Sequence, residues 1–145
     1  MDGKKGHLNF NVWVSCASLQ GMLECLDRDL DVFILDRGVF DALVWNEWLE
    51  LTGKITKAEA QQVADFFTMD RWTKLIDLIF VFTCEPKVSI EREYADQLTT
   101  KRGNIMSEDT LAQIQEITKK TIQKHGRKFR KIVPIDTTDR KRSKR

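Results

Sequence analysis

The sequence has few of the residues that build disulfide frameworks, metal centres and nucleophilic triads. Its 145 residues include three cysteines, two histidines and two prolines. No CxxC pair is present, and His7 and His125 are too few for a typical zinc site or a readable Ser-His-Asp grouping. Cys16, Cys25 and Cys84 are odd in number and widely spaced. We therefore expect three reduced, buried thiols.

Long apolar runs are also missing. No segment approaches the length that is needed to cross a bilayer, and no signal-type apolar segment follows the N-terminal residues. We therefore expect a cytoplasmic protein with no membrane partner. A chain of this length is large enough to form one domain with a hydrophobic core of its own.

An excess of one charge is confined to the C-terminal end. The net charge is +2, but residues 137–145 hold five basic residues and one acid, which leaves 19 bases and 21 acids in residues 1–136. The body therefore shows no basic bias toward nucleic acid. The basic end could contact nucleic acid or another anionic surface, although such ends are more often solvated. We expect a single domain over 1–136 and a disordered basic tail over 137–145.

Three short apolar runs, separated by helical patterns, predict an α/β fold. The runs at 31–35, 78–82 and 130–135 are each typical of a strand that is buried on both faces. Thr56 and Glu59 form a capping box, and Pro86 suits the first turn of a helix. The helical patterns cover about 9–27, 39–53, 56–75, 87–99 and 107–126. The alternation predicts a parallel three-stranded sheet with flanking helices.

The most informative stretch is 31–37, where four consecutive apolar residues run into Asp36 and Arg37. Ligands of open α/β sheets bind beyond the carboxyl ends of the strands, where this pair is predicted to lie. A carboxylate there can hold a metal ion through water, and a guanidinium can bind phosphate. The alternative is a structural ion pair at the end of a strand.

The order and spacing of these motifs resemble the later part of P-loop nucleoside and nucleotide kinases, and most of all the thymidylate kinase and deoxynucleoside kinase group. Residues 34–37 resemble the acid–Arg motif after the third strand of that family. Residues 80–86 are similar to its fourth strand, which runs into a proline-started helix. Residues 92–103 look like its lid region, and 131–136 resemble its last strand.

This resemblance implies ATP-dependent phosphoryl transfer to a nucleoside, a nucleotide or a similar small acceptor, with Mg-ATP as the donor. It implies that Asp36 lies near the magnesium ion, which it holds through water, and that Arg37 binds the acceptor. It also implies that Arg92, Lys101 and Arg102 are lid residues that contact the phosphates. Without the resemblance, these three bases are equally typical of a solvated helix face with acidic neighbours.

The aromatic residues allow two interpretations. Trp45, Phe66 and Phe67 could form a substrate pocket by stacking on a nucleoside base, with Trp48 and Trp72 nearby. Aromatic residues at helical spacing are more often part of a hydrophobic core, so we keep both interpretations open.

One departure from the family is large. The sequence contains no GxxxxGK[ST], and its seven glycines never form a phosphate-binding loop. The chain resembles the family without its first two strands, and in the family the first strand separates the third from the fourth. Either the two strands close up here, or the sheet has a gap that a partner chain fills. We expect a phosphotransferase domain that is incomplete without a P-loop segment, or else a non-catalytic homologue that serves as a binding module.

Overall fold

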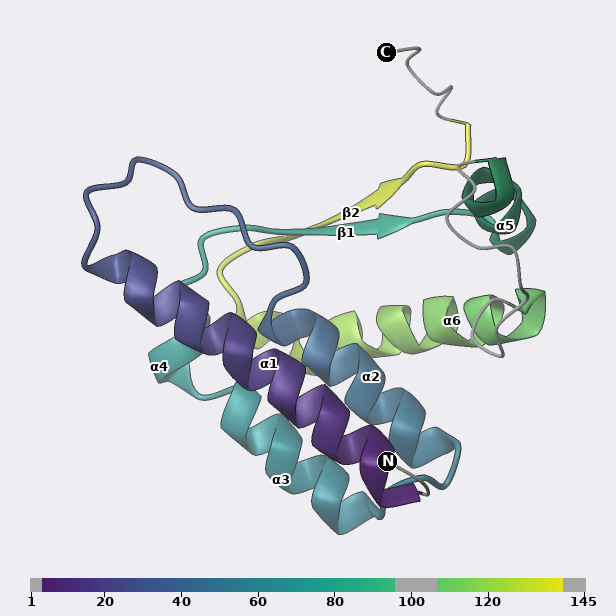
Figure 1. Cartoon of the computed structure of the whole chain (residues 1–145), viewed down its shortest axis with the longest axis horizontal. Coiled ribbons are helices and arrows are strands. Elements are labelled where there is room, and N and C mark those ends of the chain that lie inside the picture. The colour runs from purple at the N-terminus through teal and green to yellow at the C-terminus, as the bar shows by residue number, and fades with distance from the viewer. Residues whose placement is uncertain (1–3, 96–106, 140–145) are drawn as a thin grey trace.

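The computed structural model describes residues 4–95 and 107–139, and within these ranges it is mostly helical with two strands (Figure 1). The elements in chain order are α1 (Lys4–Leu26), α2 (Val39–Leu51), α3 (Lys57–Phe67), α4 (Asp70–Thr73), β1 (Ile79–Thr83), α5 (Pro86–Ala95), α6 (Glu108–His125), the 3-10 helix η1 (Gly126–Lys128) and β2 (Ile132–Asp136). The chain is thus a mixed α and β protein, as the alternating patterns predicted.

Local sequence signals fix several helix ends where they were expected. The Thr56 side chain accepts a hydrogen bond from the Glu59 backbone N–H at 3.2 Å, and the Glu59 carboxylate accepts one from the Thr56 N–H at 2.7 Å. This is the predicted capping box, and it starts α3. The helix ends at Phe67 rather than near residue 75. There the Thr68 hydroxyl donates to the Ala64 carbonyl, and the short α4 follows.

The hydrophobic core lies around α2, which packs against α1, α3 and α6. Val39, Leu43 and Phe67 are almost completely buried, and the rings of Phe40 and Phe129 meet edge to face. Apolar residues occur on several sides of α2, as expected for a helix with neighbours all around it. The helical part of the chain therefore forms a well-packed unit.

The sheet consists of β1 and β2, which run parallel with Ile79 opposite Ile132 and Thr83 opposite Asp136. This confirms the predicted parallel pairing of 78–82 with 130–135. The prediction that these strands are buried on both faces is wrong. Ile79 and Val81 pack against the core, whereas Phe80 and Phe82 are 53% and 62% exposed and stack on each other. Among the described residues, helices cover the face of β1 that carries Ile79 and Val81, and the face that carries Phe80 and Phe82 remains exposed.

The predicted strand at 31–35 is absent, so the expected three-stranded sheet is wrong. The side chains of Val32, Phe33 and Ile34 are 73%, 44% and 85% exposed. Within the described residues, no backbone N–H of this run donates to another backbone group. Figure 1 shows the segment as a long connection between α1 and α2. An apolar run forms a strand only where a neighbour completes the hydrogen-bond ladder.

The cysteines and the C-terminal end also differ from expectation. All three cysteines are free thiols, but Cys16 is exposed and the other two are only partly buried. At the start of the predicted tail over 137–145, Thr137 and Thr138 are hydrogen-bonded to residues at the end of β1, and residues 140–145 lie outside the described part of the chain. No helix among the described residues is long and apolar enough to cross a bilayer.

Candidate site at the carboxyl ends of the strands

Asp36 and Arg37, the predicted catalytic pair, lie in an exposed connection just before α2. Arg37 has a φ of 60°, which is uncommon for a residue other than glycine. Its backbone carbonyl accepts a hydrogen bond from the Ser18 hydroxyl of α1 at 3.0 Å. Because 31–35 forms no strand, this pair does not follow the end of a strand in this structure, and the positional argument for it is wrong.

The charges around Arg37 form a loose ion pair at the surface. Its guanidinium lies 3.7 Å from the Asp41 carboxylate, and the two side chains are 67% and 37% exposed. Burial raises the pKa of Asp41, and the positive charge of Arg37 opposes that shift. This geometry is typical of a helix start that is stabilised by a partly solvated pair, which is the structural alternative that the sequence left open.

The carboxyl ends of β1 and β2 instead open into a cavity of about 360 Å³, bounded by Ser89 and Arg92 of α5 and by one side of α6. A second hollow of about 430 Å³ adjoins it and shares Thr83, Cys84 and Gln115. Figure 1 shows α5 and the adjacent end of α6 beside these strand ends. The edge that holds the two hollows is the one at which parallel sheets bind their ligands.

Arg92 from α5 spans this cavity. One guanidinium nitrogen donates to the Cys84 sulfur at 3.3 Å, and the other donates to the backbone carbonyls of Thr137 and Thr138 at 2.8 and 3.0 Å. The side chain therefore ties α5 to the ends of both strands. The family resemblance predicted that Arg92 contacts phosphate. In the structure Arg92 lines the cavity, and these guanidinium N–H groups donate to Cys84, Thr137 and Thr138 of the chain itself.

Polar groups complete the lining. The Gln115 amide of α6 donates to the Cys84 carbonyl, and the Thr138 hydroxyl accepts from the Glu85 backbone N–H. The Asp136 carboxylate accepts from both the hydroxyl and the backbone N–H of Thr138, and these two bonds lower the pKa of Asp136. The first hollow thus offers hydroxyls, amides and one guanidinium, and the second adds Lys119 and the carboxylates of Glu85 and Asp136, a lining that suits a small polar ligand.

The predicted aromatic pocket is divided between core and surface. Phe67 is only 1% exposed and belongs to the core. Phe66 is partly exposed and lies edge to face against Phe67, while Trp45 packs against Trp48 of the same helix. None of these rings lines the cavity at the strand ends.

Of the three predicted lid residues, only Arg92 belongs to the described part of the chain. Lys101 and Arg102 lie outside it. Sequence reasoning missed Cys84, Gln115 and Thr137. The positions of Cys84 and Thr137, each directly after a strand, were the available signal. Gln115 gave a weaker one, as a polar residue next to Ile114 on the inward side of α6.

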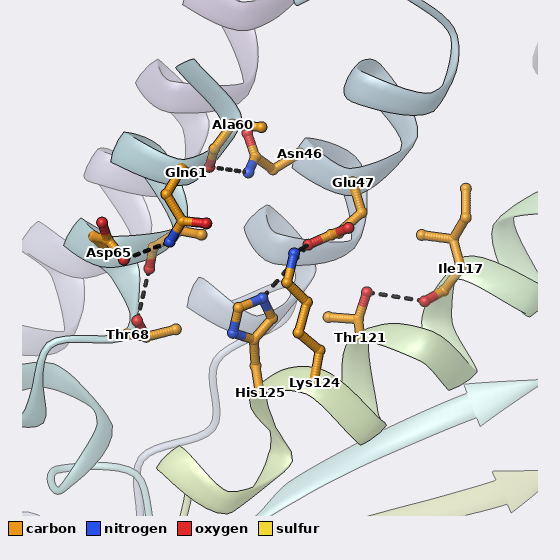
Figure 2. Close-up of polar contacts among 11 residues, drawn as sticks. Asn46, Glu47, Ala60, Gln61, Asp65, Thr68, Ile117, Thr121, Lys124 and His125 are labelled. Carbon is orange, nitrogen blue, oxygen red and sulfur yellow. Dashed lines mark hydrogen bonds and ion pairs between the residues drawn. The ribbon is translucent and has the colours of Figure 1, made fainter. Parts of the chain in front are cut away.

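A second polar cluster joins α2 to α6, two helices that are far apart in the sequence (Figure 2). The Glu47 carboxylate accepts a hydrogen bond from Lys124 and lies 3.5 Å from Nε2 of the buried His125. The contact with His125, followed by that with Lys124, lowers the pKa of Glu47 from its usual value of 4.5 to about 2. In the same region Asn46 donates to the Ala60 carbonyl at 2.7 Å.

This cluster is best described as an anchor between helices. It lines neither hollow at the strand ends. The nearby Thr121 hydroxyl donates to the Ile117 carbonyl of its own helix, so it is not directed at His125 (Figure 2). The contacts of Glu47 with Lys124 and His125 therefore join α2 to α6, and they do not form an activated nucleophile.

The described residues do not by themselves fit Mg-ATP, the cofactor that the family resemblance implies. Arg92 uses its donors on protein carbonyls, and Asp36 is exposed beside an ordinary surface pair. Among the described residues, no three side chains of the His, Cys, Asp and Glu types gather into a possible metal site. A phosphate cradle of backbone N–H groups would require the GxxxxGK[ST] loop, which the sequence does not contain.

Comparison with known proteins gives no relative. No family model, curated protein or solved structure matches this chain.

Proposed function

We propose that this chain is a P-loop kinase-like domain, related to phosphoryl transfer onto a nucleoside, nucleotide or similar small acceptor. In this proposal, it supplies the acceptor side and part of the lid. The phosphate-binding loop has to come from another polypeptide segment. The chain described here would then bind its partner segment but would not transfer a phosphoryl group without it.

One observation carries the proposal. The apolar run 32–35 is largely exposed and none of its N–H groups donates to a backbone group, while β1 has a strand on one edge only in the described part of the chain. A gap is one of the two alternatives that the resemblance leaves open, because the family places its P-loop strand between these two elements. A sheet that lacks that strand leaves backbone groups without partners on both sides of the gap.

The cavity supports the same interpretation. It lies at the carboxyl ends of two parallel strands, where phosphate-binding sites of this architecture are found. Arg92 brings a guanidinium into it from the helix that follows β1. If phosphate bound there, it would have to compete with the carbonyls of Thr137 and Thr138 for that guanidinium.

The test is calorimetric titration of Mg-ATP into the chain, alone and after addition of a separately made strand–GxxxxGKS–helix polypeptide. We expect no measurable binding to the chain alone, because the triphosphate lacks its cradle, and loss of one preorganised donor already costs roughly 3–4 kcal/mol in transition-state stabilisation. With the added segment we expect ATP binding and slow phosphoryl transfer. Replacement of the loop lysine in the added segment by methionine should abolish both.

Two outcomes would overturn the proposal. Submicromolar ATP affinity for the chain alone would show that it has a nucleotide site of another kind. Failure of the added segment to bind the chain at all would show that the gap is not built for such a strand. In the restored protein, Arg37→Ala and Asp36→Asn should each lower turnover about a hundredfold, with a melting temperature close to that of the parent.

The second candidate is a non-catalytic binding module, and the exposed surface favours it. Phe80 and Phe82 on the sheet and Val32 and Ile34 beside α2 are apolar side chains that the described part of the chain leaves largely in water. Apolar surface of this kind is typical of a protein interface. An added P-loop segment that binds the chain without ATP binding would favour this function over the first.

A further inference from the structure

We propose that the open edge of β1 is an interface between two copies of this chain. Each copy would place residues 32–35 beside β1 of the other copy as a third, parallel strand. This self-association needs no nucleotide, and it uses the edge of β1 to which the proposed function assigns a P-loop strand, so an added P-loop segment would compete with it.

The open edge is defined by the alternation of backbone groups in β1. The Ile79 N–H donates to the Lys131 carbonyl at 2.9 Å, and the Thr83 carbonyl accepts from the Thr137 N–H at 2.8 Å. Both groups point toward β2. Since successive residues of a strand direct their N–H and C=O groups to opposite edges, those of Phe80 and Phe82 point away from β2. Within the described chain no strand lies on that side.

The same chain carries an element of the kind that such an edge binds. Val32, Phe33, Ile34 and Leu35 form a continuous apolar run whose backbone N–H groups have no backbone partner in the described residues. Three of the four side chains are exposed. An open edge and an unpaired strand-forming segment are the two halves of a hydrogen-bond ladder, and strand addition is a common way of forming such a ladder.

The run is anchored at its C-terminal end to helices of its own chain. The Arg37 carbonyl accepts a hydrogen bond from Ser18 of α1, and α2 begins at Val39, which is buried in the core. These contacts fix where the run ends, beside α1 and α2. In a second copy the run has the same contacts with its own α1 and α2, and that copy as a whole can bring its exposed run to the edge of β1 in the first copy.

Charge complementarity favours the parallel direction. Residues 27–31 contain three aspartates and one arginine, whereas 127–131, just before β2, contain four basic residues. Parallel addition brings these segments to the same end of the sheet, where Asp77 already pairs with Arg130, and brings Asp36 and Arg37 to the end that carries the exposed Glu85 and Asp136. Antiparallel addition would place the aspartates beside those two acids, which is unfavourable.

The buried area fits a weak but specific dimer. From their exposed fractions, the five large apolar side chains of the edge and the run would bury at most on the order of 500–600 Å² per copy if they were covered completely. A reciprocal dimer would bury about twice that, near the lower limit of about 1,200 Å² for specific interfaces. An interface at the small end of the specific range is typical of a weak, reversible dimer.

Analytical ultracentrifugation of the full chain over about 1–200 µM tests the proposal. The wild type should change from monomer to dimer across this range. Ile34→Lys disables the run and Phe82→Lys disables the edge, so each should weaken dimerisation at least tenfold. Phe10→Lys is the matched control: Phe10 is similarly exposed but lies on α1, outside the interface, and its replacement should leave the dimer unchanged.

A mixing experiment distinguishes strand exchange from other forms of association. The Ile34→Lys chain keeps an intact edge, and the Phe82→Lys chain keeps an intact run. An equimolar mixture should therefore recover one good ladder and associate more tightly than either variant alone, with circular dichroism confirming that both are folded. A wild type that remains monomeric at the highest concentration would overturn the proposal. So would loss of the dimer in Phe10→Lys with retention in Ile34→Lys, or a mixture no tighter than its components.

Discussion

Two short apolar runs of this chain, 32–35 and 78–82, have nearly the same character but different structures. Both are uninterrupted by polar residues, and both contain β-branched and aromatic side chains. The second forms β1 and pairs with β2, whereas the first forms an exposed connection between two helices. Propensity is therefore not what separates them.

The difference lies in what surrounds each run. β1 has β2 on one edge, α6 and the core against one face, and a cluster of hydrogen bonds at its carboxyl end. The 32–35 run has none of these within the described chain, and its only nearby anchor is the carbonyl of Arg37. A strand requires a partner, and the sequence of the run does not say whether that partner is present.

The largest expected effect comes from placing a charge in each run. Val81→Asp puts a carboxylate against the core, so we expect a loss of at least about 3 kcal/mol in the free energy of unfolding. Ile34→Asp, whose side chain is already in water, should change it by less than about 0.5 kcal/mol. Urea denaturation followed by tryptophan fluorescence, at concentrations where the chain is monomeric, measures both. Equal losses would contradict the comparison.

The next effect concerns the hydrogen bonds by which Arg92 joins α5 to the strand ends, here called the Arg92 clamp. Arg92→Met keeps the apolar stem but removes the hydrogen bonds to Thr137 and Thr138, so we expect a loss of about 1.5–3 kcal/mol. The Thr137 amide should also exchange with deuterium much faster. The matched control is Arg37→Met, which breaks only an exposed ion pair and should cost no more than about 1 kcal/mol. If the control costs as much as Arg92→Met, the clamp has no special role.

A smaller effect depends on pH and concerns the anchor between α2 and α6. Because the pKa of Glu47 is lowered from 4.5 to about 2, its stabilisation is fully present above about pH 4.5 and is lost as the pH falls through about 2. The carboxylate remains partly in water, so we expect about 1–2 kcal/mol. Unfolding of wild type and Glu47→Gln should differ by this amount at pH 6 and converge near pH 2. A difference that persists near pH 2 would exclude this linkage.

The smallest effect is expected from proline in the unpaired run. Ile34→Pro removes a backbone donor that has no backbone partner in the described chain, so stability of the monomer should change by less than about 1 kcal/mol. Val81→Pro removes an N–H that points toward β2 and should unfold the sheet. Thermal denaturation of both variants at low concentration provides the measurement. A large loss from Ile34→Pro would show that the run is paired after all.

The sequence predicted what depends on local chemistry. The capping box at Thr56, the start of α2 after Gly38 and the proline-started α5 follow from side-chain and backbone rules that act within one turn. Parallel pairing of β1 with β2 was also predictable, because a helical connection between two strands permits little else.

What could not be predicted depends on contacts between distant segments. The exposure of the 32–35 run follows from the absence of a neighbouring strand, which no local pattern reports. Arg92 was placed at a phosphate site, but its bonds to Thr137 and Thr138 cross about 45 residues of chain. The partial exposure of β1 has the same origin. The apolar residues 78–82 indicate a strand that is able to be buried on both faces, but they do not indicate whether a second layer of helices is present to cover the other face.

The most direct test of this account is residue-resolved amide hydrogen exchange of the monomeric chain, which compares the two runs in one experiment. We expect the Ile79 and Val81 amides, which face β2, to be strongly protected, and the amides of residues 32–35 to exchange at nearly the rate of an unstructured peptide. Protection of 32–35 that appears only as the concentration rises would agree with strand exchange between copies. Strong protection of 32–35 in the dilute monomer would show that the run is paired within its own chain, and would contradict the central claim that it lacks a partner there.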